Sequence, residues 1–149
     1  MEHKELREAV VAEARTWLGT PFQHQGRVKG PGIDCIGLIY MLAKKYELGE
    51  TSMAVLKKSG FTGYAKVPKR GQMRSMCTEY LKQIRYEERL AGDVFLIRIG
   101  RLEGHVGLYT GDNTVIHAMS TFNKCVEHSI NSDFRLNITG TYRFPRLCN

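Results

Sequence analysis

The chain has 149 residues, of which 42% are hydrophobic and 25% charged, the composition of an ordinary globular protein. This length suffices for one hydrophobic core, so we expect a single domain across residues 1–149. The net charge of +7 would suit a polyanion, but the basic residues are scattered and no nucleic-acid motif accompanies them, so we expect a solvated basic surface and no specific nucleic-acid partner. No apolar run approaches the roughly 20 residues of a membrane-spanning helix.

The first predicted element is a helix over residues 5–18, because apolar side chains recur at helical spacing, as at Leu6, Val10 and Trp17. Its charged, amphipathic start differs from a secretory signal peptide, so we expect synthesis in the bacterial cytoplasm and exit by lysis or inside a larger particle. Residues 19–33 hold four glycines and two prolines, a composition that predicts a loop.

A second helix is predicted over residues 34–46, with Asp34 as its N-cap and Cys35 in its first turn. A cysteine at this place is open to four interpretations: a small buried hydrophobe, a metal ligand, half of a disulfide, or a nucleophile. The free N–H groups and the dipole of a helix start would lower its pKa from about 8.5 into the range of roughly 3.5 to 7.5. Gly37 allows another backbone segment to approach closely.

The cysteines of the chain are widely spaced and include no C-x-x-C pair, which argues against a zinc ribbon or a redox dithiol. Without a secretory signal, their even number does not imply disulfides. We therefore expect free thiols at Cys35, Cys77, Cys125 and Cys148.

The second half of the chain changes from helical to β-rich patterns. Residues 49–71 are mixed, and we interpret them as an irregular insertion. A third helix is predicted over residues 72–86, and strands are then predicted at 93–99, 105–110, 113–119, 124–130 and 140–145. Helices followed by a meandering antiparallel sheet indicate an α+β domain.

His105 and His117 lie in two neighbouring predicted strands, which we expect to form a hairpin through the turn sequence TGDN. A loop of residues 110–112 would place the two histidines directly opposite each other. Both rings then share one face of the sheet, because side chains alternate between faces along a strand. Opposed Cβ atoms lie about 4.5 to 5.5 Å apart, so the imidazoles are within hydrogen-bonding reach. Gly107, on the same face, leaves room for a helix end.

These residues together suit acyl transfer. A thiolate at a helix start acts as nucleophile, one histidine takes its proton, and a second polar side chain holds that histidine in the useful tautomer. Backbone N–H groups at the helix start would stabilise the oxyanion. A zinc site built from Cys35, His105 and His117 is the alternative, but no further ligand is placed beside them, so we expect no metal and no cofactor.

Several motifs in fixed order resemble the NlpC-type papain-like cysteine peptidases of bacterial cell walls. They read ARTWLGTPFQHQG, DCIGLIY, AGDVFLI, HVGLYTGD and VIHA. The chain's length, PF-x-HQ and the closing YRFP also resemble the peptidases of tailed-phage and gene-transfer-agent tail clusters. The resemblance implies Cys35 as nucleophile, His105 as base and His117 as the orienting residue. It also implies a papain-like fold, with the cysteine helix packed on the antiparallel sheet.

The function implied by the resemblance is hydrolysis of amide bonds in peptidoglycan stem peptides, often between D-glutamate and a diamino acid. In a phage-like tail this activity would open the host wall during DNA entry. Tail-tip or baseplate hub proteins would then be its partners, and the host periplasm and cell wall its place of action. Two rival interpretations remain: a structural tail-tip subunit with a vestigial site, and acyl transfer or amidase action on a lipid or other small amide.

The sequence departs from the family pattern at two places. Ile36 replaces a common serine, as in the tail-associated subgroup, and Phe22 stands where many members have a tyrosine. Phenylalanine cannot donate a hydrogen bond to an oxyanion, so His24 or Gln25 would have to substitute. We expect these residues and Asp34 to lie around the oxyanion site or the substrate groove.

Overall fold

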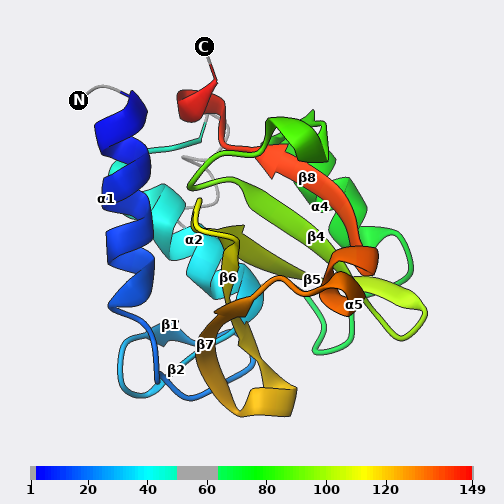
Figure 1. Cartoon of the computed structure of the whole chain (residues 1–149). Helices are drawn as coiled ribbons and strands as arrows, with labels where there is room; N and C mark the ends of the chain where they lie inside the picture. The colour runs from blue at the N-terminus through cyan, green and yellow to red at the C-terminus, as the bar shows by residue number, and fades with distance from the viewer. Residues whose placement is uncertain (1–2, 50–63, 149) are drawn as a thin grey trace.

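The computed structural model describes residues 3–49 and 64–148 and consists of helices packed on a mainly antiparallel sheet (Figure 1). The α-helices are α1 (His3–Arg15), α2 (Cys35–Tyr46), α4 (Gln72–Tyr80) and α5 (Ser132–Leu136). The strands are β1 (Arg27–Val28), β2 (Gly32–Ile33), β3 (Lys82–Ile84), β4 (Val94–Ile99), β5 (Leu102–Tyr109), β6 (Thr114–Met119), β7 (Lys124–Ser129) and β8 (Ile138–Arg143). Single 3₁₀ turns are η1 (Tyr86–Glu88), η2 (Ser120–Phe122) and η3 (Pro145–Leu147). The predicted α+β class, with the cysteine at a helix start, is confirmed.

The main sheet has the strand order β3-β8-β4-β5-β6-β7, and its paired neighbours run antiparallel. Within the segment predicted as a loop, β1 and β2 form a short antiparallel pair just before α2. This pair brings the loop back on itself beside the start of the cysteine helix. The insertion predicted at 49–71 lies largely outside the described residues.

The two faces of the sheet are buried in different cores. The larger core joins α1, α2 and α4 to alternate strand residues, among them Val94, Leu96, Val106, Leu108, Ile116 and Ala118. The opposite face carries a smaller cluster of Phe95, Ile97, Tyr109, Val115, Ile130 and Ile138, with Phe134 of α5 packed against it. The alternation predicted for the β5–β6 hairpin is therefore correct, and the histidine face is covered as well.

The end of the third predicted helix is wrong, and one short helix was missed. The third helix ends at Tyr80 instead of residue 86, because Leu81 is extended and Lys82–Ile84 pair with β8. The apolar spacing of this segment fits either a helix or an edge strand, and the pairing with β8 decides for the strand. α5 was not predicted, since residues 132–136 are too few to establish a helical period.

The register of the β5–β6 hairpin also differs from the prediction. Leu108 pairs with Ile116 and Tyr109 with Val115, so the same register sets His117 opposite Gly107. The loop comprises residues 111–113, where Gly111 and Asn113 adopt positive φ angles of 94° and 58°. Because the register shift is by an even number of residues, the two histidines keep the same face and become diagonal neighbours.

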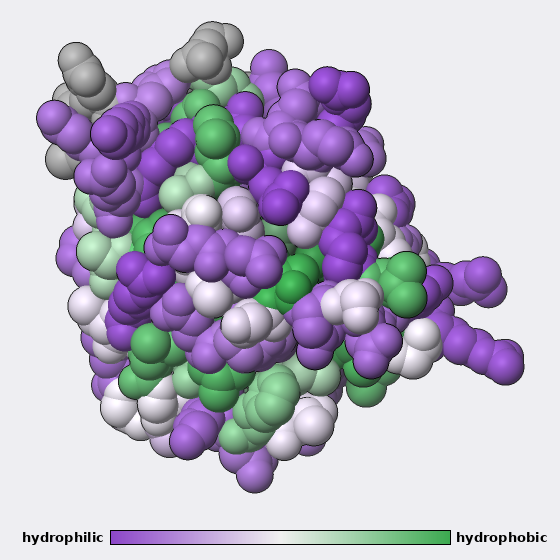
Figure 2. Space-filling view, viewed as in Figure 1, coloured by the Kyte–Doolittle hydropathy of each residue, from purple (hydrophilic) through white to green (hydrophobic). Residues whose placement is uncertain are grey.

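The surface in Figure 2 is largely hydrophilic, with apolar side chains interspersed. The large exposed apolar residues come from different elements: Leu18, Val28, Val67, Leu90, Ile99, Phe122 and Leu136. Within residues 3–49 and 64–148, no helix combines the length and apolar character needed to cross a membrane.

Candidate active site

Asp34 caps the helix that carries Cys35, as predicted. Its backbone is extended, and its Oδ1 atom accepts a hydrogen bond of 2.7 Å from the N–H of Gly37. Cys35 is the first residue of α2 and is partly exposed. All four cysteines are free thiols.

The carboxylate of Asp34 is buried and holds the preceding loop to the helix start. It accepts hydrogen bonds from the N–H of Gln25 at 2.7 Å and from the Tyr64 hydroxyl at 2.5 Å. The Arg27 guanidinium donates to it at 3.1 Å and to the Tyr64 hydroxyl at 2.7 Å. A carboxylate only accepts, so the Asp34 side chain cannot donate to an oxyanion; it caps α2 and binds the loop.

Gly37 provides the close approach that the sequence indicated. A Cβ atom at this residue would lie 2.5 Å from Nη1 of Arg27 and 2.6 Å from the carbonyl oxygen of Gly26. Gly107 has a different role from the one predicted, because its missing Cβ clears side chains instead of a helix end. A Cβ there would lie 2.8 Å from Cγ2 of Val115 and 3.4 Å from Cβ of His117.

The surroundings of the Cys35 thiol act on its pKa in opposite directions. Burial raises the pKa to about 12, and the charge of Asp34 adds to this effect, whereas hydrogen bonds from the backbone N–H groups of Val106, Ile36 and Cys35 itself lower it. The predicted lowering by the helix start is therefore outweighed by loss of solvation. At neutral pH the resting group is a neutral thiol.

The start of α2 lies against β5 beside His105. The N–H of Val106, the residue that follows His105, is close enough to the thiol to lower its pKa. In the described part of the chain, no hydrogen bond joins the Cys35 sulfur to the His105 ring. The structure thus brings Cys35 to the histidine strand.

His105 and His117 form a buried pair. Nε2 of His105 lies 2.5 Å from Nδ1 of His117, and the two residues are 4% and 1% exposed. Burial lowers the pKa of His105 to about 4 and that of His117 to about 2, with further lowering from the neighbouring histidines. Both rings are neutral at pH 7, and Nδ1 of His105 is the nitrogen that this pair leaves unused.

A third histidine, which the sequence analysis missed, extends the pair. Nε2 of His128 lies 2.7 Å from Nε2 of His117, and Nδ1 of His128 lies 3.0 Å from the carbonyl oxygen of Ser129. His128 is in β7 opposite Val115, on the same face as His117. Phe134 packs edge-on against it, with ring centroids 4.9 Å apart. The sequence placed His128 in the predicted strand 124–130, but only the β6–β7 register shows that it lies beside His117.

The residues predicted around an oxyanion site or substrate groove lie on the Asp34 side of the thiol. The side chain of Gln25 donates to the backbone oxygen of Tyr64 at 2.7 Å, and the His24 ring meets the Tyr64 ring edge-on at 5.5 Å. Phe22 packs against the main core. Tyr64 was missed by the sequence analysis. Its hydroxyl lies beside Asp34 near the helix start, whereas Phe22 has no hydroxyl.

Comparison with known proteins identifies the family. Residues 19–139 match the model of the NlpC/P60 family. The chain belongs to this family. A comparison with curated proteins gives no match.

Several solved structures are similar to this NlpC/P60 domain. An NlpC/P60 family protein from Bacillus cereus is 19% identical with a TM-score of 0.64, over 93% of this chain and 40% of that one. RipB, a peptidoglycan hydrolase from Mycobacterium tuberculosis, is 17% identical with a TM-score of 0.62, over 95% of this chain and 66% of that one. The NlpC/P60 domain of the peptidoglycan hydrolase SagA is 22% identical with a TM-score of 0.53, over 83% of this chain and 89% of that one. The NlpC/P60 domain therefore spans less than half of the Bacillus cereus chain, and these likenesses establish the fold.

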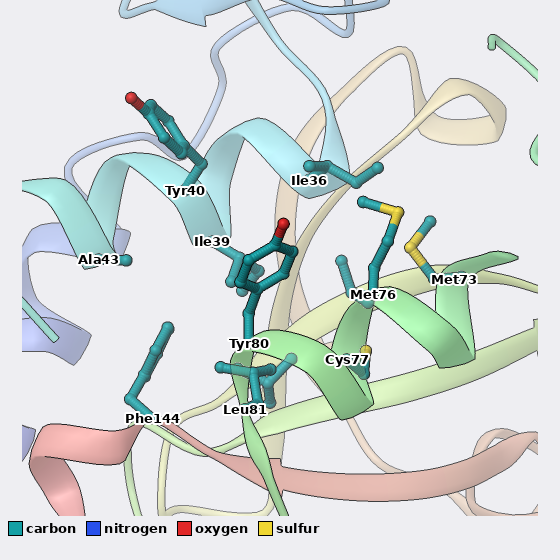
Figure 3. A pocket seen from close by; sticks show the side chains of 12 residues that line it. Ile36, Ile39, Tyr40, Ala43, Met73, Met76, Cys77, Tyr80, Leu81 and Phe144 are labelled. Carbon is teal, nitrogen blue, oxygen red and sulfur yellow. The ribbon is translucent and has the colours of Figure 1, made fainter. Parts of the chain in front are cut away.

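An apolar pocket separates α2 from α4 in this NlpC/P60 domain (Figure 3). Ile36 and Val106, both adjoining the thiol, contribute to its wall, and Met76 and Tyr80 face α2 from the other side. Its volume of about 60 Å³ is far below the roughly 300–1,000 Å³ of ordinary ligand pockets. It has room for a small apolar side chain.

The zinc alternative concerned Cys35, His105 and His117. Within the described ranges, no group of three or more His, Cys, Asp or Glu side chains is arranged to hold a metal ion. The three clustered histidines bond to one another instead, through Nε2 of His105, both nitrogens of His117 and Nε2 of His128.

Proposed function

We propose that the chain is a cysteine endopeptidase that hydrolyses amide bonds in peptidoglycan stem peptides. Cys35 is the nucleophile, His105 the base and His117 the residue that orients it. The observation that carries the proposal is the start of α2 lying against β5 beside the buried His105–His117 pair. Membership of the NlpC/P60 family and likeness to two named peptidoglycan hydrolases support the substrate class.

Proton transfer in this mechanism accompanies the attack. Since burial raises the pKa of Cys35 and lowers that of His105, a preformed ion pair is disfavoured at rest. The Cys35 sulfur bonds to the amide carbon while its proton passes to Nδ1 of His105, and substrate binding shortens the contact between the two groups. The oxyanion accepts hydrogen bonds from backbone N–H groups at the start of α2.

The later steps return the enzyme to its starting state. His105 donates the proton to the leaving amine as the C–N bond breaks, which leaves a thioester on Cys35. Water then attacks the thioester carbonyl and gives a proton to His105. As the C–S bond breaks, this proton returns to the sulfur, and the acid product leaves.

Digestion of purified peptidoglycan followed by mass spectrometry of the muropeptides tests the activity. We expect cleaved stem peptides with the wild-type chain, including cleavage between D-glutamate and the diamino acid. Cys35→Ala should lower the rate by at least about 10³-fold, since the nucleophile is lost. Cys148→Ala, at another partly exposed thiol, is the matched control and should remain active. Unchanged hydrolysis by Cys35→Ala would refute the proposal.

The biological setting that we propose is a phage or gene-transfer-agent tail, in which the enzyme opens the host wall during DNA entry. Resemblance to the tail-associated subgroup, including Ile36, supports this setting. Tail-tip or baseplate hub proteins would be the partners, and the host periplasm and cell wall the place of action. Particles carrying Cys35→Ala should assemble normally and enter poorly, whereas failed assembly would favour a structural tail-tip subunit.

A lipid or other apolar small amide is a poorer substrate candidate. The apolar pocket next to the thiol has a volume of about 60 Å³. A cavity of this size cannot enclose an acyl chain. A stem peptide lying across the helix start does not depend on the pocket.

A further inference from the structure

A continuous hydrogen-bonded chain runs from His105 to the backbone of β7. The contacts are His105 Nε2 to His117 Nδ1 at 2.5 Å, His117 Nε2 to His128 Nε2 at 2.7 Å, and His128 Nδ1 to the Ser129 oxygen at 3.0 Å. Every ring nitrogen of the three histidines except Nδ1 of His105 faces one of these partners. The hydrogen bonds in this series can all run in one direction, from donor to acceptor. The group at the β7 end determines that direction.

The Ser129 carbonyl sets this direction. A carbonyl oxygen only accepts, so Nδ1 of His128 carries the hydrogen and Nε2 of the neutral ring carries a lone pair. His117 must then donate from Nε2 to His128, which leaves the lone pair of His117 on Nδ1. His105 in turn donates from Nε2 to His117. Its own lone pair is left on Nδ1, the nitrogen that the proposed mechanism needs as base.

We propose that His128, anchored on the carbonyl of Ser129, is a positioning residue that sets the tautomers of His117 and His105. The inference rests on the proposed function for its catalytic meaning, but the tautomers themselves do not depend on any substrate. His128 touches neither Cys35 nor the reacting amide. It acts through the two rings between them.

Protonation of His128 reverses the chain. A ring with hydrogens on both nitrogens donates from Nε2 to His117, so the hydrogens of His117 and His105 must sit on Nδ1. His105 then has no lone pair to take the thiol proton. Of the three rings, His128 is half-buried, whereas His105 and His117 are buried.

The groups facing His128 are mostly uncharged. His117 meets it from β6, and Phe134 of α5 and Phe122 of η2 pack against its ring. The neighbouring Glu127 is bonded to Arg15 and Thr114. In α5, Arg135 lies over the Tyr86 ring, and Asp133 is exposed in the first turn. The histidine chain is thus the main electrostatic partner of His128.

Two substitutions of His128 separate positioning from packing. In His128→Gln, the amide oxygen accepts a hydrogen bond from Nε2 of His117 as the imidazole does, so kcat near pH 7.5 should stay within about threefold of the wild-type value. His128→Leu removes the acceptor and should lower kcat by about 10- to 100-fold with little change in KM. His3→Gln, at a histidine of α1, is the matched control and should behave as wild type.

Nitrogen-15 NMR of the histidine rings in the full chain tests the tautomers without substrate. We expect Nε2–H at His105 and His117 and Nδ1–H at His128 in the wild type, and a mixture at His117 and His105 in His128→Leu. If the wild-type rings show these tautomers but peptidoglycan is not cleaved, the proposed function fails and this inference stands. If His128→Leu keeps the wild-type tautomers at His105 and His117, the inference is overturned.

Discussion

At the scale of single residues, the protonation state of Cys35 shows which of two opposed effects wins. Backbone N–H groups of Cys35 and Ile36 at the helix start, together with that of Val106 in β5, favour the thiolate. Burial favours the thiol more strongly and raises the pKa to about 12. The nucleophile therefore depends on His105 for its proton transfer, and the histidine chain becomes the limiting part of the site.

Alkylation of Cys35 by iodoacetamide should reflect this raised pKa. Only the thiolate reacts, so the rate in the folded protein should rise about tenfold per pH unit between pH 6 and pH 10, without levelling off. Peptide mass spectrometry distinguishes Cys35 from the other thiols. In the urea-unfolded chain, the rate should level off above about pH 8.5, the ordinary range. A plateau near pH 6 in the folded protein would instead indicate a resting thiolate.

The residues of the site were predictable to different degrees. Cys35 could be placed because a cap and a helix start are local features, and the His105–His117 contact survived an error in register because only strand parity mattered. His128 and Tyr64 depend on contacts between distant segments. Sequence spacing does not specify the β6–β7 register, nor the return of Tyr64 to Asp34 across 30 residues.

At the scale of elements, the position of α2 depends on its contact with the loop before it. The Arg27 side chain and the Gly26 carbonyl occupy the space beside Gly37. The loop in turn is tied to the helix cap through Asp34. This contact fixes where the first turn of α2, and with it Cys35, stands against β5.

Gly37→Ala should destabilise the domain and disturb its site. Replacing glycine by alanine within a helix stabilises the folded state by up to about 1 kcal/mol. Here, however, the new Cβ would lie only 2.6 Å from a backbone oxygen and would force the loop away, which costs about 1–3 kcal/mol of stability. We expect a net loss of unfolding free energy in urea denaturation and a lower kcat. Lys44→Ala, at an exposed position of the same helix, is the control, and its unfolding free energy should rise slightly. An equal rise in unfolding free energy in both variants would contradict the expected clash.

The elements themselves were predicted better than their ends. β4, β6 and β7 lie within the strands expected from short runs rich in β-branched and other apolar residues, which are typical of strands. The end of α4 was missed because Leu81 and Ile84 also fit a helical stripe. β1 and β2 are two-residue strands, too short for any periodicity to indicate.

At the scale of the whole molecule, one buried carboxylate connects the two ends of the chain. Asp93, just before β4, is fully buried and bonded to Arg7 of α1 at 3.2 Å and to Arg143 of β8 at 2.9 Å. Arg7 also donates to the carbonyl of Leu147 in η3 at 3.1 Å. These contacts hold α1 and the C-terminal turn together beside the sheet (Figure 1).

Asp93→Asn should therefore destabilise the fold without touching the active site. Asparagine keeps the shape but not the charge, so two guanidinium groups in largely buried positions lose their counter-ion, at a cost of about 3 kcal/mol. Urea denaturation at pH 7 measures the loss, while kcat in the folded protein should stay near the wild-type value. Asp112→Asn provides the control: its carboxylate is 80% exposed and 3.8 Å from Arg15, so the change should stay below about 0.5 kcal/mol. Equal effects of the two substitutions would mean that Asp93 contributes no more than a surface ion pair, and that apolar packing alone holds α1 on the sheet.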